Sequence, residues 1–83
     1  MGNNRIIIER KKEMMRLGMF KVQDDPLDEL GSLKIALNAI KSGCPTVVVD
    51  TGTTANGRLM GKVHVLCDDN IVRQAWILHG MSF

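Results

Sequence analysis

Cysteine and aromatic residues are scarce in this 83-residue chain, which holds two cysteines, two phenylalanines, one tryptophan and no tyrosine. Two cysteines are too few for a disulfide framework. No run approaches the roughly 20 apolar residues that a membrane span needs. The apolar run Ile6–Ile8 is also too short for the core of a secretory signal. We therefore expect a cytoplasmic protein that has no membrane partner and keeps both thiols reduced.

Apolar residues make up 45% of the chain and charged residues 24%, which is typical of a globular domain rather than of a disordered segment. A chain of this length forms one domain at most. It buries only about 60–65% of the surface that its unfolded state exposes, so its stability is marginal without further support. We therefore expect a single domain over residues 1–83 that is a homo-oligomer or a subunit of a larger complex.

Positive charge is concentrated at the start of the chain. Residues 1–23 carry six basic and two acidic side chains, a net +4, whereas the remainder carries five basic and seven acidic side chains, a net −2. Apolar residues at helical spacing predict a methionine-rich helix from about Asn4 to Leu17, which Gly18 ends before a connector to residue 23. The candidate interaction residues are Arg5, Arg10, Lys11, Lys12, Met14, Met15 and Arg16. Nucleic acid is a less favoured partner, because no aromatic residue is placed to stack on bases.

A second helix, within residues 24–83, is indicated by signals at both of its ends. Asp25 is expected to be the N-cap and Pro26 the first helical residue. Leucine, alanine and isoleucine recur at three- and four-residue spacing as far as Ile40. Gly43 and then Pro45 predict that the helix ends there.

Beyond Pro45 the pattern becomes extended. Thr46–Val49 is β-branched throughout, as in a strand that is buried on both faces. Arg58–Cys67 alternates in polarity, and Asp68–Asn70 is typical of a hairpin turn. Ile71–Leu78 fits a third strand, which we favour, or a helix. These elements predict an α+β fold of order ααβββ, in which two helices pack on a small, mostly antiparallel, three-stranded sheet.

Thiols and imidazoles are present, but their spacing separates them. Cys44 follows a helix C-terminus, whose negative end raises the pKa of a thiol. His64 and Cys67 are three residues apart on a strand, so their side chains point to opposite faces. No pair among these residues, the nearby aspartates and His79 has the close spacing of recognised zinc sites. We therefore expect no catalytic residue, no enzymatic activity, no metal and no cofactor.

The segment between the first two predicted strands is the most distinctive polar stretch. It supplies hydroxyl groups, two glycines and an arginine directly after a strand, where anion-binding loops often lie. It does not match the phosphate-binding loop pattern, and an ordinary polar connection is the alternative. The candidate ligand-binding residues are Thr51, Thr53, Thr54, Asn56 and Arg58.

Several motifs follow one another between Ala36 and Val72. A helix ending at Gly43 precedes a strand that ends Val-Val-Asp, a G-x-L-x-G-x-V strand and an aspartate. In this order they resemble one CBS-type regulatory module. The resemblance implies a regulatory role and a helix after the aspartate. Such modules bind adenine nucleotides through a threonine and an aspartate, in place of which this chain has His64 and Cys67.

The leading hypothesis is a non-enzymatic binding or regulatory module that acts by association and senses a small anionic ligand. One alternative is a structural or assembly subunit of a phage, a mobile element or a larger complex. Another is a nucleic-acid-binding accessory protein that uses the basic N-terminal helix.

Overall fold

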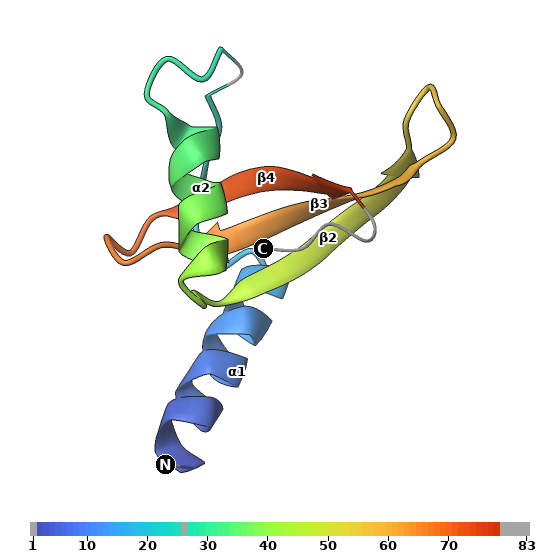
Figure 1. Ribbon diagram of the computed structural model, residues 1–83. Helices are drawn as coiled ribbons and strands as arrows, with labels where there is room; N and C mark the ends of the chain where they lie inside the picture. The colour runs from blue at the N-terminus through green and yellow to red at the C-terminus, as the bar shows by residue number, and fades with distance from the viewer. Residues whose placement is uncertain (1, 26, 79–83) are drawn as a thin grey trace.

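The computed structural model describes residues 2–25 and 27–78, with the backbone alone for residues 2 and 3. Its elements are α1 (Gly2–Arg16), β1 (Val22–Gln23), α2 (Ser32–Lys41), β2 (Thr46–Thr53), β3 (Leu59–Leu66) and β4 (Val72–Leu78). The strands form one sheet of order β1-β4-β3-β2. Helix α2 lies across one face of this sheet, and α1 projects away from it (Figure 1).

The α+β class is confirmed, whereas the predicted number of strands is wrong. Strands β2, β3 and β4 form the expected antiparallel meander. A fourth strand, β1, pairs in parallel with β4 through Val22 opposite Val72 and Gln23 opposite Arg73. Two residues are too short to show a periodicity, so no local pattern predicts β1. It forms because the chain that leaves α1 passes along the free edge of β4.

The last segment is the strand that we favoured over a helix. A turn connects β3 to β4, in which the amide of Asn70 donates to the carbonyl of Cys67 over 2.9 Å. Asn70 has a positive φ of 64°, a conformation that asparagine adopts more readily than most residues. The turn therefore reverses the chain, and β4 returns alongside β3.

Strand β2 is not buried on both faces, so that prediction is wrong. Val47 is buried, but Val48 and Val49 are 60% and 39% exposed. The pairing with β3 shifts between Val48 and Asp50, which leaves Val49 as a bulge. Strand β2 is an edge of the sheet, and its hairpin with β3 extends beyond α2 (Figure 1). Its β-branched residues therefore reflect strand propensity rather than burial.

Helix α2 ends where we expected and begins six residues later than we expected. At its end, Gly43 has a φ of 86° and the amide of Cys44 donates to the carbonyl of Ala39. At its start, the N-cap is Gly31, in the left-handed conformation and without a side-chain capping bond. Asp28 also has a positive φ, of 51°, so a regular helix cannot run through the preceding residues. The expected position of Pro26 lies outside the described residues.

The buried side chains form two clusters, one on each face of the sheet. The cluster beneath α2 consists of Ala36, Ala39, Val63, Val65, Cys67 and Ala75. The other consists of Met15, Val47, Leu66 and Val72, with Phe20 packed against it. Helix α1 spans the range predicted for it within two residues, and Gly18 follows it with a φ of 73°. Within the described residues, no helix is long and apolar enough to cross a membrane.

Candidate interaction surface

Helix α1 is anchored near its C-terminal end and is otherwise exposed. Met15 is 4% exposed and packs with Val47 and Leu66. Towards the free end, Ile6 and Ile7 are 65% and 51% exposed. Exposed leucine and isoleucine are common singly, but several on one projecting helix form an unpartnered apolar surface.

The basic side chains of α1 lie among these apolar residues. At 100° per residue, Arg10 and Lys11 lie on the same side of the helix as Ile7. Leu17 lies next to Arg10 on that side. All four residues are exposed. Two other basic side chains of α1, Lys12 and Arg16, form ion pairs with glutamates three residues earlier, over 3.7 and 3.6 Å. We call Ile6, Ile7, Arg10, Lys11 and Leu17 the α1 face.

The structure divides the seven residues predicted for interaction into three groups. Arg5, Arg10, Lys11 and Arg16 are exposed, whereas Lys12 and Met14 are partly buried. Met15 is in the core and holds the helix against the sheet. The sequence pattern therefore identified the helix but not the division between its anchoring and exposed residues.

The segment before α2 is acidic and carries exposed leucines. Residues 24–29 contain four carboxylates, those of Asp24, Asp25, Asp28 and Glu29, and no basic residue. Leu27 and Leu30 are 76% and 67% exposed. Two of the carboxylates stabilise the local conformation: Asp25 accepts a hydrogen bond from the Leu30 amide, and Asp28 accepts one from the Leu33 amide over 2.9 Å. We call these residues, Asp24–Asp25 and Leu27–Leu30, the acidic loop.

A cavity of about 180 Å³ lies between the acidic loop, the start of α2 and β4. Its lining residues are Gln23, Asp24, Asp25, Asp28, Ser32, Leu33, Gln74 and Trp76. The side chain of Trp76 is half exposed. Ser32 is 5% exposed, and its hydroxyl has no hydrogen-bond partner among the described residues. A buried hydroxyl without a partner is unfavourable.

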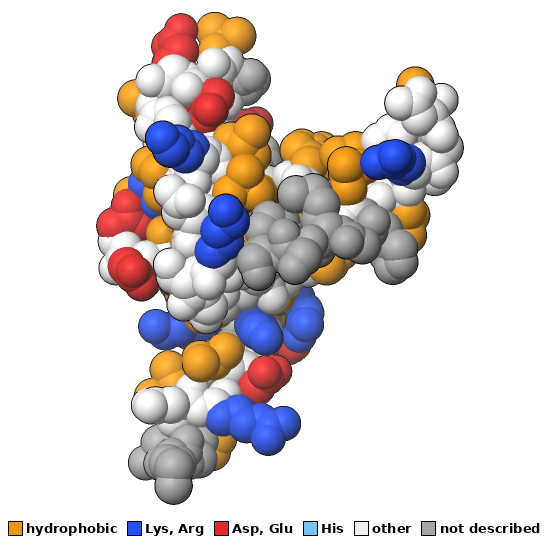
Figure 2. All heavy atoms as spheres, viewed as in Figure 1, with side chains coloured by type: hydrophobic (Ala, Val, Ile, Leu, Met, Phe, Trp, Pro, Cys, Tyr) orange, Lys and Arg blue, Asp and Glu red, His pale blue; other side chains and the backbone are white. Residues whose placement is uncertain are grey.

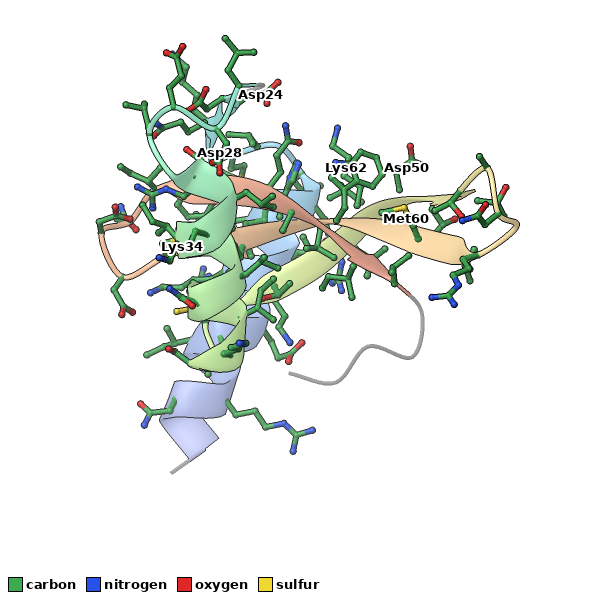
Figure 3. All side chains as sticks on the ribbon, turned by 45° about the horizontal axis from the view of Figure 1, so that its top comes forward. Asp24, Asp28, Lys34, Asp50, Met60 and Lys62 are labelled. Carbon is green, nitrogen blue, oxygen red and sulfur yellow. The ribbon has the colours of Figure 1, made fainter. Side chains whose placement is uncertain are left out.

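The acidic loop and α1 lie at opposite ends of the molecule. Figure 1 shows α1 at one end and the segment before α2 at the other, with the sheet between them. In Figure 2 acidic side chains gather at the end occupied by that segment, and several basic side chains cover α1. Asp24 and Asp28 remain at this far end when the molecule is turned (Figure 3). The two charged regions of one copy therefore do not contact each other.

The sheet face opposite α2 carries a second polar group of residues. The ammonium group of Lys62 lies 5.8 Å from the centre of the Trp76 ring, within the range of a cation–π interaction. Asp50 pairs with Lys62 across β2 and β3, and both side chains project from the same side of the sheet (Figure 3). Lys62 therefore already occupies one side of the Trp76 ring.

The predicted ligand-binding residues lie at the free end of the β2–β3 hairpin. Thr51 and Thr53 end β2, and Thr54, Asn56 and Arg58 are in or beside the turn. The hydroxyl of Thr54 accepts a hydrogen bond from the Arg58 amide over 3.2 Å. The turn therefore uses this hydroxyl for its own closure, and anion binding by the five residues stays a prediction.

Among the described residues, neither thiol forms a hydrogen bond with the imidazole of His64. Cys67 is buried beneath α2, and Cys44 is partly buried beside it. Burial, and then the carboxylate of Asp68 at 3.6 Å, raises the pKa of the Cys44 thiol. Burial and the charge of Lys62 lower the pKa of His64. Among the described residues, no group of three or more His, Cys, Asp or Glu side chains is arranged to hold a metal ion. His79 lies outside these residues.

Sequence reasoning missed the acidic loop because its residues also fit a helix start. Asp25, Asp28 and Glu29 agree with an N-cap and a first turn, so they were explained by capping. The signal that identifies them as a surface is the run of four carboxylates around two leucines. Like α1, this run combines charged with apolar side chains, but its charges are negative.

Comparisons of this chain with protein-family models, with curated proteins and with solved structures find no match.

Proposed function

We propose that this protein is a non-enzymatic association module that assembles with copies of itself through α1. The observation that carries the proposal is the exposure of Ile6, Ile7 and Leu17 on a helix that is anchored only near its C-terminal end. Removing such side chains from water is the main driving force of protein association. A second copy can provide this burial without any further component.

The total surface supports the same conclusion. The chain exposes 6045 Å², whereas a folded monomer of 9.2 kDa exposes roughly 4,900 Å². Its radius of gyration is 13.1 Å, against about 12 Å for a compact domain of this length. Helix α1 projects from the sheet, and the β2–β3 hairpin extends beyond α2 (Figure 1). Both features are typical of subunits that complete their burial on assembly.

Light scattering coupled to size exclusion tests this proposal over a wide range of protein concentrations. We expect a mass above 9.2 kDa that increases with concentration, and a return to the monomer for Ile7→Gln/Leu17→Gln. The matched control is Leu59→Gln, which removes an exposed leucine (46%) from β3 and should leave the mass unchanged. A wild type that stays monomeric throughout, or a helix variant that assembles like the wild type, contradicts the proposal.

Nucleic-acid binding through α1 is a second candidate, favoured by the exposure of Arg5, Arg10 and Lys11. The neighbouring apolar side chains favour a protein partner instead, since phosphate contacts need charge alone. Fluorescence anisotropy with a labelled duplex of random sequence separates the two. Steeply salt-dependent binding that is lost on replacing Arg10 and Lys11 by alanine supports this second candidate.

A further inference from the structure

We propose that the α1 face of one copy docks on the acidic loop of the next copy, so that the subunits join head to tail. This inference rests on the proposed self-association and identifies the surface that receives α1. Its first support is charge: residues 1–23 carry a net +4, and residues 24–29 carry four carboxylates and no basic residue. Opposite potentials of this kind steer association and fix its orientation.

In the part of the chain that the structure describes, no ion pair joins the basic residues of α1 to the acidic loop. The ion pairs of the described residues are Lys12–Glu9, Arg16–Glu13 and Arg73–Asp69. None of them uses a carboxylate of the acidic loop, and none uses Arg10 or Lys11. Because α1 and the loop lie at opposite ends of the molecule (Figures 1 and 2), only a second copy can bring them together.

The apolar residues of the two surfaces also match. Leu27 and Leu30 are exposed beside the carboxylates, as Ile7 and Leu17 are exposed beside Arg10. A contact of charge alone would be weak and screened by salt. Apolar side chains within the same contact add burial, so each surface supplies both components that a stable contact needs.

The cavity beside the acidic loop provides a specific position for Arg10. It is open at the surface and is bordered by Asp24, the Trp76 ring and Ser32. A guanidinium group placed there meets a carboxylate and an aromatic ring, both of which attract it. It also brings a donor towards the buried hydroxyl of Ser32, which has no partner among the described residues.

Such a contact is heterologous, since the two copies use different surfaces. Each assembly therefore keeps one free α1 face and one free acidic loop at its ends, and further copies can add until a ring closes. A symmetric contact between two α1 helices is disfavoured, because each helix carries five basic and two acidic side chains, a net +3.

Complementation between two variants tests the pairing. Ile7→Gln/Arg10→Gln disables the α1 face. Asp24→Lys/Glu29→Lys disables the acidic loop and leaves the hydrogen bonds of Asp25 and Asp28 in place. We expect each variant alone to be monomeric by light scattering, and an equimolar mixture to give a species of twice the monomer mass and nothing larger. The complex stops there because its two free surfaces are the disabled ones. Asp50→Lys/Asp68→Lys, with the same change in charge elsewhere, should assemble like the wild type.

Each other outcome overturns a specific statement. A wild type that remains monomeric contradicts both this inference and the proposed function. If assembly depends on α1 but Asp24→Lys/Glu29→Lys still assembles, the proposed function is supported and the inference is contradicted. The inference also fails if two monomeric variants do not combine, or if nuclease treatment dissolves the wild-type assembly. Should circular dichroism show that the lysine variant is unfolded, Asp24→Asn/Glu29→Gln takes its place and should assemble more weakly than the wild type; equal assembly overturns the inference.

Discussion

The guanidinium of Arg73 donates to both carboxylate oxygens of Asp69, over 2.9 and 2.8 Å. The Arg73 side chain is 8% exposed and that of Asp69 47%, so the pair joins a buried cation to a carboxylate at the rim. Arg73 is in β4 opposite β1, and Asp69 is in the turn before β4. The pair therefore fixes the turn against the strand that the turn introduces.

Asp69→Ala is expected to destabilise the fold more than Arg73→Met does. The first change leaves a buried guanidinium without its partner, whereas the second replaces it by an apolar side chain of similar length. Chemical denaturation of both variants measures the difference. Equal midpoints for the two variants would contradict this expectation.

The same pair predicts a dependence of stability on pH. The hydrogen bonds from Arg73 lower the pKa of Asp69 below its ordinary value of 3.8. A lowered pKa in the folded state means that the stabilisation is complete above about pH 4 and is lost as the pH falls through the folded-state pKa. Wild type should therefore lose more free energy of unfolding on acidification than Asp69→Asn does. The free energy of unfolding is measured as a function of pH for both proteins. An equal loss on acidification would contradict this expectation.

Two valines of the sheet, one buried and one exposed, give a matched pair of substitutions. Val65 is fully buried beneath α2, and Val48 is 60% exposed on the edge strand. Val65→Ala should cost about 2 kcal/mol, since it removes two buried methyl groups and leaves a cavity. Val48→Ala should change the free energy of unfolding by less than about 0.5 kcal/mol. Urea denaturation measures both, and a comparable loss for Val48→Ala would place that residue in a buried contact.

Cys44 should react slowly with alkylating reagents near neutral pH, because burial and the Asp68 carboxylate raise the pKa of its thiol and the thiolate is the reactive form. Asp68→Asn removes the second cause and should increase the alkylation rate severalfold. Peptide mass spectrometry separates this reaction from that of the buried Cys67. An unchanged rate would mean that burial alone controls the thiol.

Trp76 is the single tryptophan of the chain and lines the cavity beside the acidic loop. If α1 of a second copy covers this cavity, water leaves the half-exposed ring and its emission shifts to shorter wavelength as the concentration rises. Ile7→Gln/Arg10→Gln should keep the emission of the dilute protein at all concentrations. A shift of the same size in this variant would assign the change to another contact.

Features that depend on neighbouring residues could be predicted from the sequence. Gly18 and Gly43 mark the ends of both helices, and the turn before β4 follows from Asp68–Asn70. The start of α2 could not be predicted in this way. Asp25, Pro26 and Asp28 satisfy every local rule for a helix start, but Asp28 and Gly31 adopt positive φ and delay the helix.

Features that depend on distant residues could not be predicted. Strand β1 exists only because β4 offers an edge, and Val48 is exposed only because β2 is the other edge. The sequence pattern pointed to the basic residues of α1 as candidate interaction residues, but not to the exposed leucines and the carboxylates at the far end of the molecule. Their role in an interface stays a prediction. Their separation is a property of the fold, and it is what makes head-to-tail contact between copies possible.

Zero-length cross-linking of a mixture of isotopically light and heavy protein tests head-to-tail association most directly. A carbodiimide joins a lysine to a carboxylate that it contacts, and the isotopes show whether the two peptides come from different copies. We expect mixed-isotope links from Lys11 to Asp24 or Glu29. Links that join only peptides of the same isotope, or lysines and glutamates of two α1 helices, would contradict it.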